Sequence, residues 1–427
     1  MKTAIALLLL TAACTKPADR CTSNLDCTDP AYPFCDVTGQ FPASGGDMNV
    51  CTIPPPAADA GVPSDAPSTP VPGGCSPGAA TCTNNELTVC NADGMTATMT
   101  ACPVSCEPSG MACKTIVPSN GLGTALAAAA AQPDVTLPSG ATINTDTGAI
   151  MDSGGNPIEV ASLVVANGTG SLRAFIARSF SISKVSASGN ASVAFVAAGS
   201  IMIGGTLDVS ANGTTPGPGV SIAPQASSGL AGGGGGNATT GGTSTAGSSG
   251  AAQTTFSPLG GGGGGGAGVV TGDGPGGGGG GAIELVSSTA IDLLAAGVID
   301  VGGGGGQAGA GGGAGGTVVL EAPVIDVEGI VGAGGGGGGG DPGCASPAGQ
   351  DATPATAASG GGCRPSQFAF EFGGGGGFAS QVPGAGLQYG GGGAVGRLDL
   401  VTLDGTYKLG TSAVVGAVLT TEKLVTE

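Results

Sequence analysis

Residues 315–341 read GGTVVLEAPVIDVEGIVGAGGGGGGGD, and residues 280–306 read GGAIELVSSTAIDLLAAGVIDVGGGGG. Each stretch holds three short apolar runs and then passes into almost pure glycine. Apolar and polar residues alternate with period two within the runs, which is typical of strands that bury one face. Related lines occur at 171–189, 191–213 and 396–418. The sequence therefore predicts a unit of two or three strands that recurs along the chain.

The recurring lines keep one register, and Glu284, Asp292, Asp300 and Asp326 are expected to face outward. Because β-branched positions stack from line to line, the pattern predicts an all-β fold, a right-handed parallel β-helix (β-solenoid) with glycine-rich loops. A β-sandwich with glycine-rich hairpins is the runner-up. The residues expected to point inward are Val193, Phe195, Ile201, Ile203, Leu207, Val209, Ile283, Leu285, Ile291, Leu293, Ile299, Val301, Val318, Leu320, Ile325, Val327 and Val331.

Glycine accounts for 91 of the 427 residues, and its runs fall between the apolar lines. Insertions at one position of a repeat emerge along one edge of the stack. We therefore expect the glycine runs to be loops on one side of the strands, either mobile or packed side by side as extended, hydrogen-bonded segments. Collagen is excluded, because no strict spacing of glycine at every third residue is sustained.

The chain starts with MKTAIALLLLTAAC, in which a lysine precedes an apolar run and small residues lead to Cys14. This pattern predicts a secretory signal peptide over 1–13, which is too short to span a membrane. It is similar to a bacterial lipoprotein signal, in which the cysteine after the cleavage point is lipidated, although Thr11 stands where that family prefers an aliphatic residue. Ordinary cleavage, which would leave Cys14 as a free thiol, is the alternative.

The chain has 13 cysteines, an odd number for a secreted protein. Without Cys14, the others fall into even groups that can close as disulfides in an oxidising compartment. Zinc is the alternative use of these side chains, although the chain has no histidine. We predict that Cys344 pairs with Cys363. The other groups are Cys21, Cys27, Cys35 and Cys51, and then Cys75, Cys82, Cys90, Cys102, Cys106 and Cys113.

Composition divides the chain into six parts. An alanine-rich stretch stopped by Pro133 predicts a short helix that covers the open end of the core. The parts are a signal peptide (1–13), a lipid anchor with a four-Cys module (14–51), a Pro/Ala-rich linker (52–74), a six-Cys module (75–113), a capping helix (119–134) and a glycine-rich β-solenoid (135–427).

Three stretches carry a resemblance to a known group of proteins. They are the six-Cys run that ends in CKTIVPSNGL (113–122), the SANG turn at 210–213 and the closing GGGGAVGRLDL at 390–400. With these features, residues 75–427 resemble the glycine-rich, cysteine-module-bearing surface lipoproteins that some Gram-negative bacteria make in large paralogous sets. The resemblance implies a location at the bacterial cell surface and a β-helix-like repeat region, and it implies no activity.

The sequence offers little for catalysis. Because the chain has no histidine, Ser-His-Asp and Cys-His catalysis and histidine-ligated metals are excluded, and we expect no catalytic residue, metal or cofactor. The stretch GGGGGD at 336–341 begins a calcium-binding nonapeptide but lacks the aliphatic residue that the motif needs. Asp292 and Asp326 are expected on adjacent strands, where solvated outward positions are favoured over a catalytic pair of carboxyl groups.

One segment is unusually rich in aromatic residues. Three of its phenylalanines alternate along FAFEF, so their rings lie on one face of a strand. This face is expected to pack on the solenoid, and a binding platform is the alternative. The residues are Phe368, Phe370, Phe372, Phe378 and Tyr389.

The leading hypothesis is a surface-anchored structural or adhesive lipoprotein of a Gram-negative cell envelope, without catalysis. Its partners would be the outer membrane, through the lipid anchor, and an envelope or matrix polysaccharide or a surface protein. A net charge of −18 argues against nucleic acid. The alternatives are a polysaccharide-active β-helix enzyme (a lyase or glycosidase) and a carbohydrate- or calcium-binding module.

Overall fold

The computed structural model describes residues 34–36, 50–52, 69–70, 74–168, 170–219, 226, 228, 231–244, 247–253, 255, 257–269, 272–342, 347–362, 374–377 and 389–426. The chain divides into two compact units, Met1–Val62 and Pro63–Glu427. In the first unit, β1 (Phe34–Asp36) pairs antiparallel with β2 (Val50–Thr52), and Cys35 lies opposite Cys51 in the ladder.

The six-Cys module, within the second unit, is a small antiparallel sheet with the strand order β3-β6-β5-β4. Asn84 and Asn85 join β4 to β5 with φ angles of 53° and 61°, the left-handed conformation that a tight hairpin turn requires. Three disulfides close the module: Cys75–Cys90, Cys82–Cys106 and Cys102–Cys113. The strands are β3 (Thr69–Pro70), β4 (Ala80–Thr83), β5 (Glu86–Cys90) and β6 (Thr96–Ala101).

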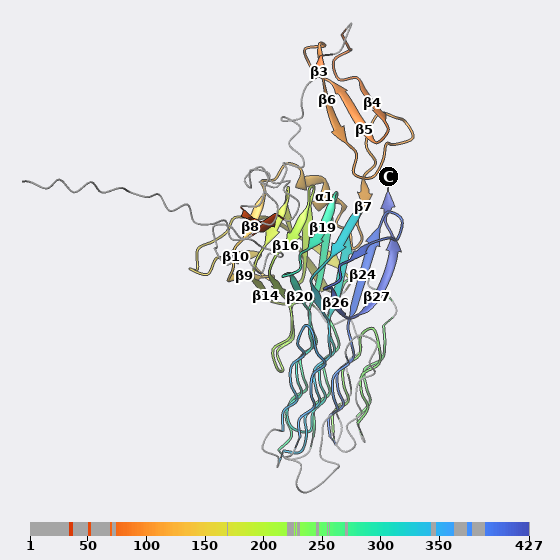
Figure 1. The fold of residues 1–427 in the computed structure, drawn as a ribbon. Helices are drawn as coiled ribbons and strands as arrows, with labels where there is room; N and C mark the ends of the chain where they lie inside the picture. Colours follow the sequence, from red (N-terminus) through yellow and green to blue (C-terminus); the bar gives the residue numbers. More distant parts are fainter. Residues whose placement is uncertain are drawn as a thin grey trace, which may run out of the picture. The chain divides into compact units, whose positions relative to one another are not determined.

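Three larger sheets follow in the same unit (Figure 1). Sheet I has the order β10-β9-β14-β17-β20-β23-β26, sheet II the order β11-β12-β15-β18-β21-β24-β27, and sheet III the order β25-β22-β19-β16-β13-β8. The strands are β8 (Val135–Leu137), β9 (Ala141–Asn144), β10 (Ala149–Met151), β11 (Ala161–Asn167), β12 (Gly170–Ala177), β13 (Phe180–Ile182), β14 (Val185–Ser188), β15 (Ser192–Ala197), β16 (Ile201–Ile203), β17 (Thr206–Asp208), β18 (Ala282–Ser287), β19 (Ala290–Leu293), β20 (Val298–Asp300), β21 (Thr317–Glu321), β22 (Val324–Val327), β23 (Ile330–Gly332), β24 (Arg397–Thr402), β25 (Lys408–Leu409), β26 (Val414–Gly416) and β27 (Val418–Lys423).

The main core lies between these sheets, and its residues are the alternate positions that the sequence predicts to point inward. Ile201 lies beside Ile291, and Ile291 beside Ile325, on neighbouring parallel strands of sheet III. Each of these side chains is at most 1% exposed. All of the predicted inward residues belong to this one cluster, so the predicted period-two register is confirmed.

A second apolar layer covers the outer face of sheet II. The helix expected within 119–134 is α1 (Gly123–Ala129), the single helix among the described residues, and its buried Ala125, Leu126 and Ala129 pack in this layer. The helix thus lies on a sheet face and its buried residues are not part of the main core cluster. Just before the helix, β7 (Ile116–Val117) pairs antiparallel with β28 (Val425–Thr426).

The described glycine-rich segments form a packed bundle. They lie between β17 and β18, between β20 and β21, and between β23 and β24, and Figure 1 shows them as extended segments that run side by side. Backbone hydrogen bonds join the three insertions: Gly235 N–H donates to Gly312 O (2.9 Å), and Gly336 N–H donates to Gly313 O (2.8 Å). We call the described parts of 231–281, 302–316 and 333–396 the glycine bundle.

Close backbone approach explains why the bundle consists of glycine. A Cβ atom added at Gly313 would lie 1.9 Å from Gly278 O, and one added at Gly390 would lie 1.7 Å from Ala310 O. Ordinary contacts of a Cβ atom are 3.4–4 Å, so even alanine does not fit at these positions. Of the two arrangements expected for the glycine runs, the described segments adopt the packed, hydrogen-bonded one.

The predicted fold class, a right-handed parallel β-helix (β-solenoid) with glycine-rich loops, is wrong. Sheets I and II are mixed, because β10 pairs antiparallel with β9 and β11 pairs antiparallel with β12. All three sheets are open and end on edge strands. The described glycine-rich segments pack into one bundle through backbone hydrogen bonds. The runner-up, a β-sandwich, requires two facing sheets, whereas the described residues form three large ones.

The predicted fold class is wrong because side-chain alternation does not report the turns between strands. Gly168, the second residue of the Asn-Gly pair at 167–168, adopts a φ of 59° at the end of β11. The chain then reverses, and Asn167 pairs with Gly170 at the start of the antiparallel ladder. Alternation of apolar residues shows which face of a strand is buried, but it does not show the direction in which the next strand runs.

Candidate functional site

Half of the residues that the sequence suggests for a site lie outside the described residues. They are Cys14, Cys21, Cys27, Cys344, Cys363, Phe368, Phe370, Phe372 and Phe378. Tyr389 is described, and its hydroxyl donates a hydrogen bond to Asp341 Oδ2. The lipid anchor, the pairing of Cys344 with Cys363 and the aromatic platform therefore stay predictions.

Asp292 and Asp326 lie side by side on β19 and β22, as the register predicts. Lys408 on β25 contacts this pair from the next strand. Its Nζ donates to Asp326 Oδ2 and lies 3.5 Å from Glu328 Oε1. Burial raises the pKa of the Asp292 carboxyl, and the Asp326 carboxylate adds to the rise while Lys408 opposes it. Asp326 therefore forms an ion pair with Lys408. The arrangement of Asp292, Asp326 and Lys408 is closer to a surface ion pair than to a catalytic pair of carboxyl groups.

A second set of charged residues lies under the layer that covers sheet II. Glu284 on β18, Glu321 on β21, and Arg397 and Asp399 on β24 are at most 7% exposed. They point to the outer face, as predicted for Glu284, but they are not solvated. Residues of β7, α1 and Leu259 share this layer with them. Buried ionisable side chains are costly, so each must be held by specific contacts.

Two residues of the segment before α1 hold the buried glutamates. Ser119 N–H donates to Glu321 Oε2 (2.9 Å), and Ser119 Oγ donates to Glu284 Oε1 (2.9 Å). Asn120 Nδ2 donates to Glu284 Oε2 (2.9 Å). Burial raises the pKa of the Glu284 carboxyl to about 8, and the neighbouring Glu321 carboxylate adds to the rise. At neutral pH the Glu284 carboxyl is therefore mostly protonated.

Asp399 and Arg397 extend this cluster along β24. Arg397 Nη2 donates to Gln253 O (2.6 Å). Burial raises the pKa of the Asp399 carboxyl to about 7, and Arg397 opposes the rise. Asp399 Oδ2 has no hydrogen-bond partner. Since Glu284 and Asp399 are separated by β21, which carries Val319 between them, their carboxyl groups do not converge on one point.

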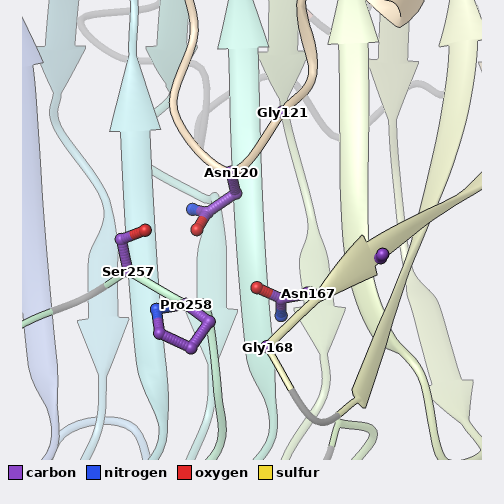
Figure 2. Close-up of a pocket in the computed structure, with 7 residues that line it drawn as sticks. Asn120, Gly121, Asn167, Gly168, Ser257 and Pro258 are labelled. Atoms are coloured by element: carbon purple, nitrogen blue, oxygen red, sulfur yellow. The ribbon is translucent and has the colours of Figure 1, made fainter.

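A pocket of about 320 Å³ opens beside Asn120. It is lined by three segments that are far apart in the sequence: 120–121, 166–168 and 257–258 (Figure 2). Asn167 fixes the third segment to the second, because Leu259 N–H donates to Asn167 Oδ1 (2.9 Å) and Asn167 Nδ2 donates to Leu259 O. These bonds leave Asn167 no free amide group on that side, so it acts as a support of the pocket wall.

Asn120 carries an acceptor without a partner in the wall beside the pocket. Its amide nitrogen is occupied by Glu284 and by Ser119 Oγ (3.1 Å). Its Oδ1 is buried and has no partner. Figure 2 shows the Asn120 amide oxygen directed toward the side of Ser257 and Pro258. This oxygen is thus a buried acceptor without a partner, and it is not exposed to a molecule in the pocket.

The buried glutamates themselves are not placed for acid or base catalysis on a bound molecule. Glu284 is 0% exposed and lies behind Ser119 and Asn120, so its carboxyl group is out of reach of a molecule in the pocket. A general acid must come within hydrogen-bond reach of the atom that it protonates. We interpret the Glu284 and Glu321 pair as the support that orients Asn120.

Sequence reasoning did not find this site. Asn120 appears in the sequence only within the SNGL that follows the six-Cys run, and Asn167 only within a turn signal. Ser257 and Pro258 stand between glycine-rich stretches that carry no periodicity. One available signal was Glu284, an acidic residue inside a strand of otherwise buried residues, which requires a polar partner.

Among the described residues, the one group of three cysteine, histidine or carboxylate side chains close enough to hold a metal is Cys82, Cys102 and Cys106. All three take part in disulfides, so the zinc alternative finds no support in this module. In the part of the chain that the structure describes, no helix has the length and apolar character needed to cross a membrane.

Comparison of the chain with protein-family models, with curated proteins and with solved structures found no match.

Proposed function

We propose that the protein is a structural or adhesive lipoprotein, anchored at the surface of a Gram-negative cell envelope. The observation that carries this proposal is the glycine bundle. Its segments come from three insertions, bond to one another through backbone groups and leave no room for side chains at positions such as Gly313 and Gly390. A region built in this way offers rigidity and almost no side-chain chemistry, which suits a structural element.

Two further features support the proposed location at the cell envelope. The disulfides Cys75–Cys90, Cys82–Cys106 and Cys102–Cys113 are typical of proteins that mature in an oxidising compartment. The signal-like start of the chain, with Cys14 after its apolar run, is typical of export followed by lipidation. Outer membrane attachment through Cys14 and contact with an envelope or matrix polysaccharide or a surface protein belong to the same proposal.

The polysaccharide-active enzyme has less support. Its best candidate pair is Asp292 and Asp326, and Lys408 engages that pair directly. The other alternative, a carbohydrate- or calcium-binding module, stays a prediction.

An attachment assay tests the adhesive role. Three strains are compared on immobilised matrix polysaccharide: one that displays the protein, one that lacks it, and one that makes Cys14→Ser at the same level. We expect stronger attachment by the first strain than by the other two, because adhesion needs the protein to be held at the surface. Equal attachment by all three strains would contradict the adhesive role.

A further inference from the structure

The chain contains three Asn-Gly pairs, at 120–121, 167–168 and 212–213. The asparagine of such a pair can lose its side-chain amide, because the glycine that follows has no Cβ atom to shield its backbone nitrogen. That nitrogen attacks the asparagine Cγ, a five-membered ring closes, and ammonia leaves. The structure gives the three pairs different surroundings, so the fold determines which of them reacts.

Two of the three side-chain amides are held in place. Asn167 is 5% exposed, and its amide donates to Leu259 O and accepts from Leu259 N–H (2.9 Å). Asn120 Nδ2 donates to Glu284 Oε2 (2.9 Å) and to Ser119 Oγ (3.1 Å). Ring closure requires the side chain to rotate toward the next backbone nitrogen, which would break these bonds. The fold therefore protects both asparagines.

The glycines of these two pairs are also crowded, whereas the third is not. A Cβ atom added at Gly168 would lie 2.7 Å from Pro258 Cγ, and one added at Gly121 would lie 3.3 Å from Val165 Cγ1. A Cβ atom added at Gly213 would meet no heavy atom within 4 Å. The pair at 212–213 thus has open space beside its glycine.

Asn212 has the freedom that the other two asparagines lack. It is exposed, and its side-chain amide makes no hydrogen bond with another residue that the structure describes. Its backbone is fixed in a tight turn, because Asn212 N–H donates to Thr215 O and Thr215 N–H donates to Asn212 O, each at 3.0 Å. The side chain can therefore rotate toward Gly213, and water reaches it.

A carboxyl group is already placed on the nitrogen that would attack. Gly213 N–H donates to Asp351 Oδ1 (3.1 Å) and to Asp351 Oδ2 (3.0 Å). A general base must lie within about 2.6–3.2 Å of the atom whose proton it takes, and both oxygens meet this condition. The pair at 212–213 thus combines a free amide, an open approach and a base.

We propose that Asn212 is the site of spontaneous deamidation in this protein, with Asp351 as the base. Asp351 takes the proton of Gly213 N as this nitrogen forms a bond to Asn212 Cγ. The Cγ–Nδ2 bond then breaks, and the amide nitrogen leaves as ammonia with that proton. Water opens the ring at one of its two carbonyl carbons and gives aspartate or isoaspartate. One water is consumed, one ammonia is released, and nothing is oxidised or reduced.

The product changes a junction of the glycine bundle. Asp351 also accepts from Gly305 N–H (2.7 Å), so one carboxyl group joins the segments that follow β17 and β20. A carboxylate at position 212 would repel Asp351, and isoaspartate would add a carbon atom to the backbone of the turn. Either product weakens this junction, whether or not the protein is adhesive.

The chain supplies its own matched comparison, because residues 166–169 and 211–214 both read ANGT. The full-length protein is incubated at neutral pH, folded in one sample and unfolded in guanidinium chloride in another. Peptide mapping by mass spectrometry follows the conversion of each asparagine to the acid. We expect similar rates at Asn167 and Asn212 in the unfolded chain. Folding should slow Asn120 and Asn167 by at least about tenfold and should not slow Asn212.

One variant tests the base. Asp351→Asn should slow conversion of Asn212 in the folded protein by at least about tenfold, since it removes a base of the kind that contributes about 10²–10⁴-fold in enzymes. The rate in the unfolded chain should stay the same. Asp152→Asn is the matched control: Asp152 also accepts backbone N–H groups in an exposed turn, those of Gly154 and Asn156, and neither residue follows an asparagine. This control should convert Asn212 at the wild-type rate.

Two results would overturn the proposal. If folding slows Asn212 as much as Asn167, the turn protects it and the site is not reactive. If Asp351→Asn folds and converts Asn212 as fast as the wild-type protein or faster, Asp351 is not the base. The comparison of the two ANGT sites needs no variant, so it decides the reactive site even if Asp351→Asn does not fold.

Discussion

Glu284 is the residue whose chemistry depends most on the fold. It stands in a strand at an outward position, where an acidic side chain would ordinarily be solvated. Here Ser119 and Asn120 cover it and donate hydrogen bonds to its two carboxyl oxygens, so that its side chain is fully buried. The cost of this burial is reduced when the carboxyl is protonated, which makes the stability of the region depend on pH.

The direction of that dependence follows from the two pKa values. The Glu284 carboxyl has a pKa of 4.5 in the ordinary state and about 8 in the folded protein. Between these values the folded state binds more protons than the unfolded state. Stability is therefore greatest below about pH 4.5 with respect to this group and falls as the pH rises through about 8.

We expect Glu284→Gln to melt at a higher temperature than the wild-type protein at pH 9 and at a similar temperature at pH 5. The oxygen of the glutamine amide can accept from Asn120 Nδ2, its nitrogen can donate to Ser119 Oγ, and the amide cannot ionise. Asp399 and Asp300, whose pKa values burial raises to about 7, keep part of the slope in the variant. Thermal melts at pH 5, 7 and 9 measure the effect.

Glu159→Gln provides the control, because Glu159 is exposed and should leave the pH profile unchanged. The groups around Glu284 that also carry charge are Glu321, Asp399, Arg397 and Glu422, and all of them are retained in both variants. Parallel decline of the wild-type and Glu284→Gln melting temperatures between pH 5 and pH 9 would show that Glu284 is not the titrating group.

At the scale of one element, β22 shows how alternation separates two faces. Ile325 is 1% exposed in the main core, where it lies beside Ile291. The next residue, Asp326, points outward and pairs with Lys408. Period two requires this contrast, because adjacent side chains of a strand point to opposite faces.

We expect Ile325→Asp to cost several kcal/mol or to prevent folding, since it would bury an unpaired carboxyl group among aliphatic side chains. Asp326→Ala should cost less than about 1 kcal/mol. It removes an exposed ion pair, which contributes little, and it also removes the repulsion of Asp292. Thermal and denaturant melts of both variants compare the two positions. Equal losses, or a larger loss for Asp326→Ala, would mean that the register assigned to β22 is wrong.

At the scale of the whole molecule, the glycine bundle makes three distant insertions depend on one another. A single residue, Gly313, contacts both of the other insertions. Its oxygen accepts a hydrogen bond from Gly336 N–H (2.8 Å), and a Cβ atom added to it would lie 1.9 Å from Gly278 O. A side chain at one such position must displace the backbone of another insertion. Sensitivity to glycine substitution is therefore a property of the assembled bundle.

We expect Gly313→Ala to destabilise the protein by about 1–3 kcal/mol or more, through overpacking. Gly123→Ala is the matched control, because Gly123 begins α1 and a Cβ there meets nothing within 4 Å. Alanine favours a helix by about 0.8–1.0 kcal/mol over glycine, so this variant should be slightly stabilised. The two unfolding midpoints decide the matter, and a Gly313→Ala variant as stable as Gly123→Ala would contradict close packing.

Cys14 determines the proposed address of the whole chain, and it lies outside the described residues. We expect Cys14→Ser to move the protein from the outer membrane fraction to the soluble fraction, because a lipid anchor supplies the membrane affinity. Fractionation followed by mass analysis of the N-terminal peptide measures both the location and the lipid. Unchanged membrane association of the variant would reject lipidation at Cys14.

The predicted Cys344–Cys363 disulfide also lies outside the described residues. Such a bridge would close a glycine-rich insert and stabilise it by about 3 kcal/mol in the chain-entropy account. Mass mapping of the unreduced protein should recover one peptide pair that contains both cysteines. A free thiol at either position would exclude the pairing.

The sequence by itself determined which residues form the core and where the glycine-rich insertions fall. Ile291, Ile325 and the residues that share their alternation are buried as predicted, because side-chain alternation is a local property of each strand. The common register of the recurring lines correctly predicted which residues become neighbours on adjacent strands, such as Asp292 and Asp326. The packed arrangement of the glycine runs was one of two outcomes that composition left open.

Only the tertiary structure decided the direction of the first strands, the covering of sheet II and the pocket. The antiparallel β11–β12 pair depends on a turn at Gly168, which the periodicity of the strands does not report. The contact of Ser119 with Glu284 joins residues 165 positions apart. The burial and raised pKa of Glu284 and the unpartnered amide oxygen of Asn120 all arise from such contacts. They depend on which distant segment packs against a side chain, and not on the neighbours of that side chain in the sequence.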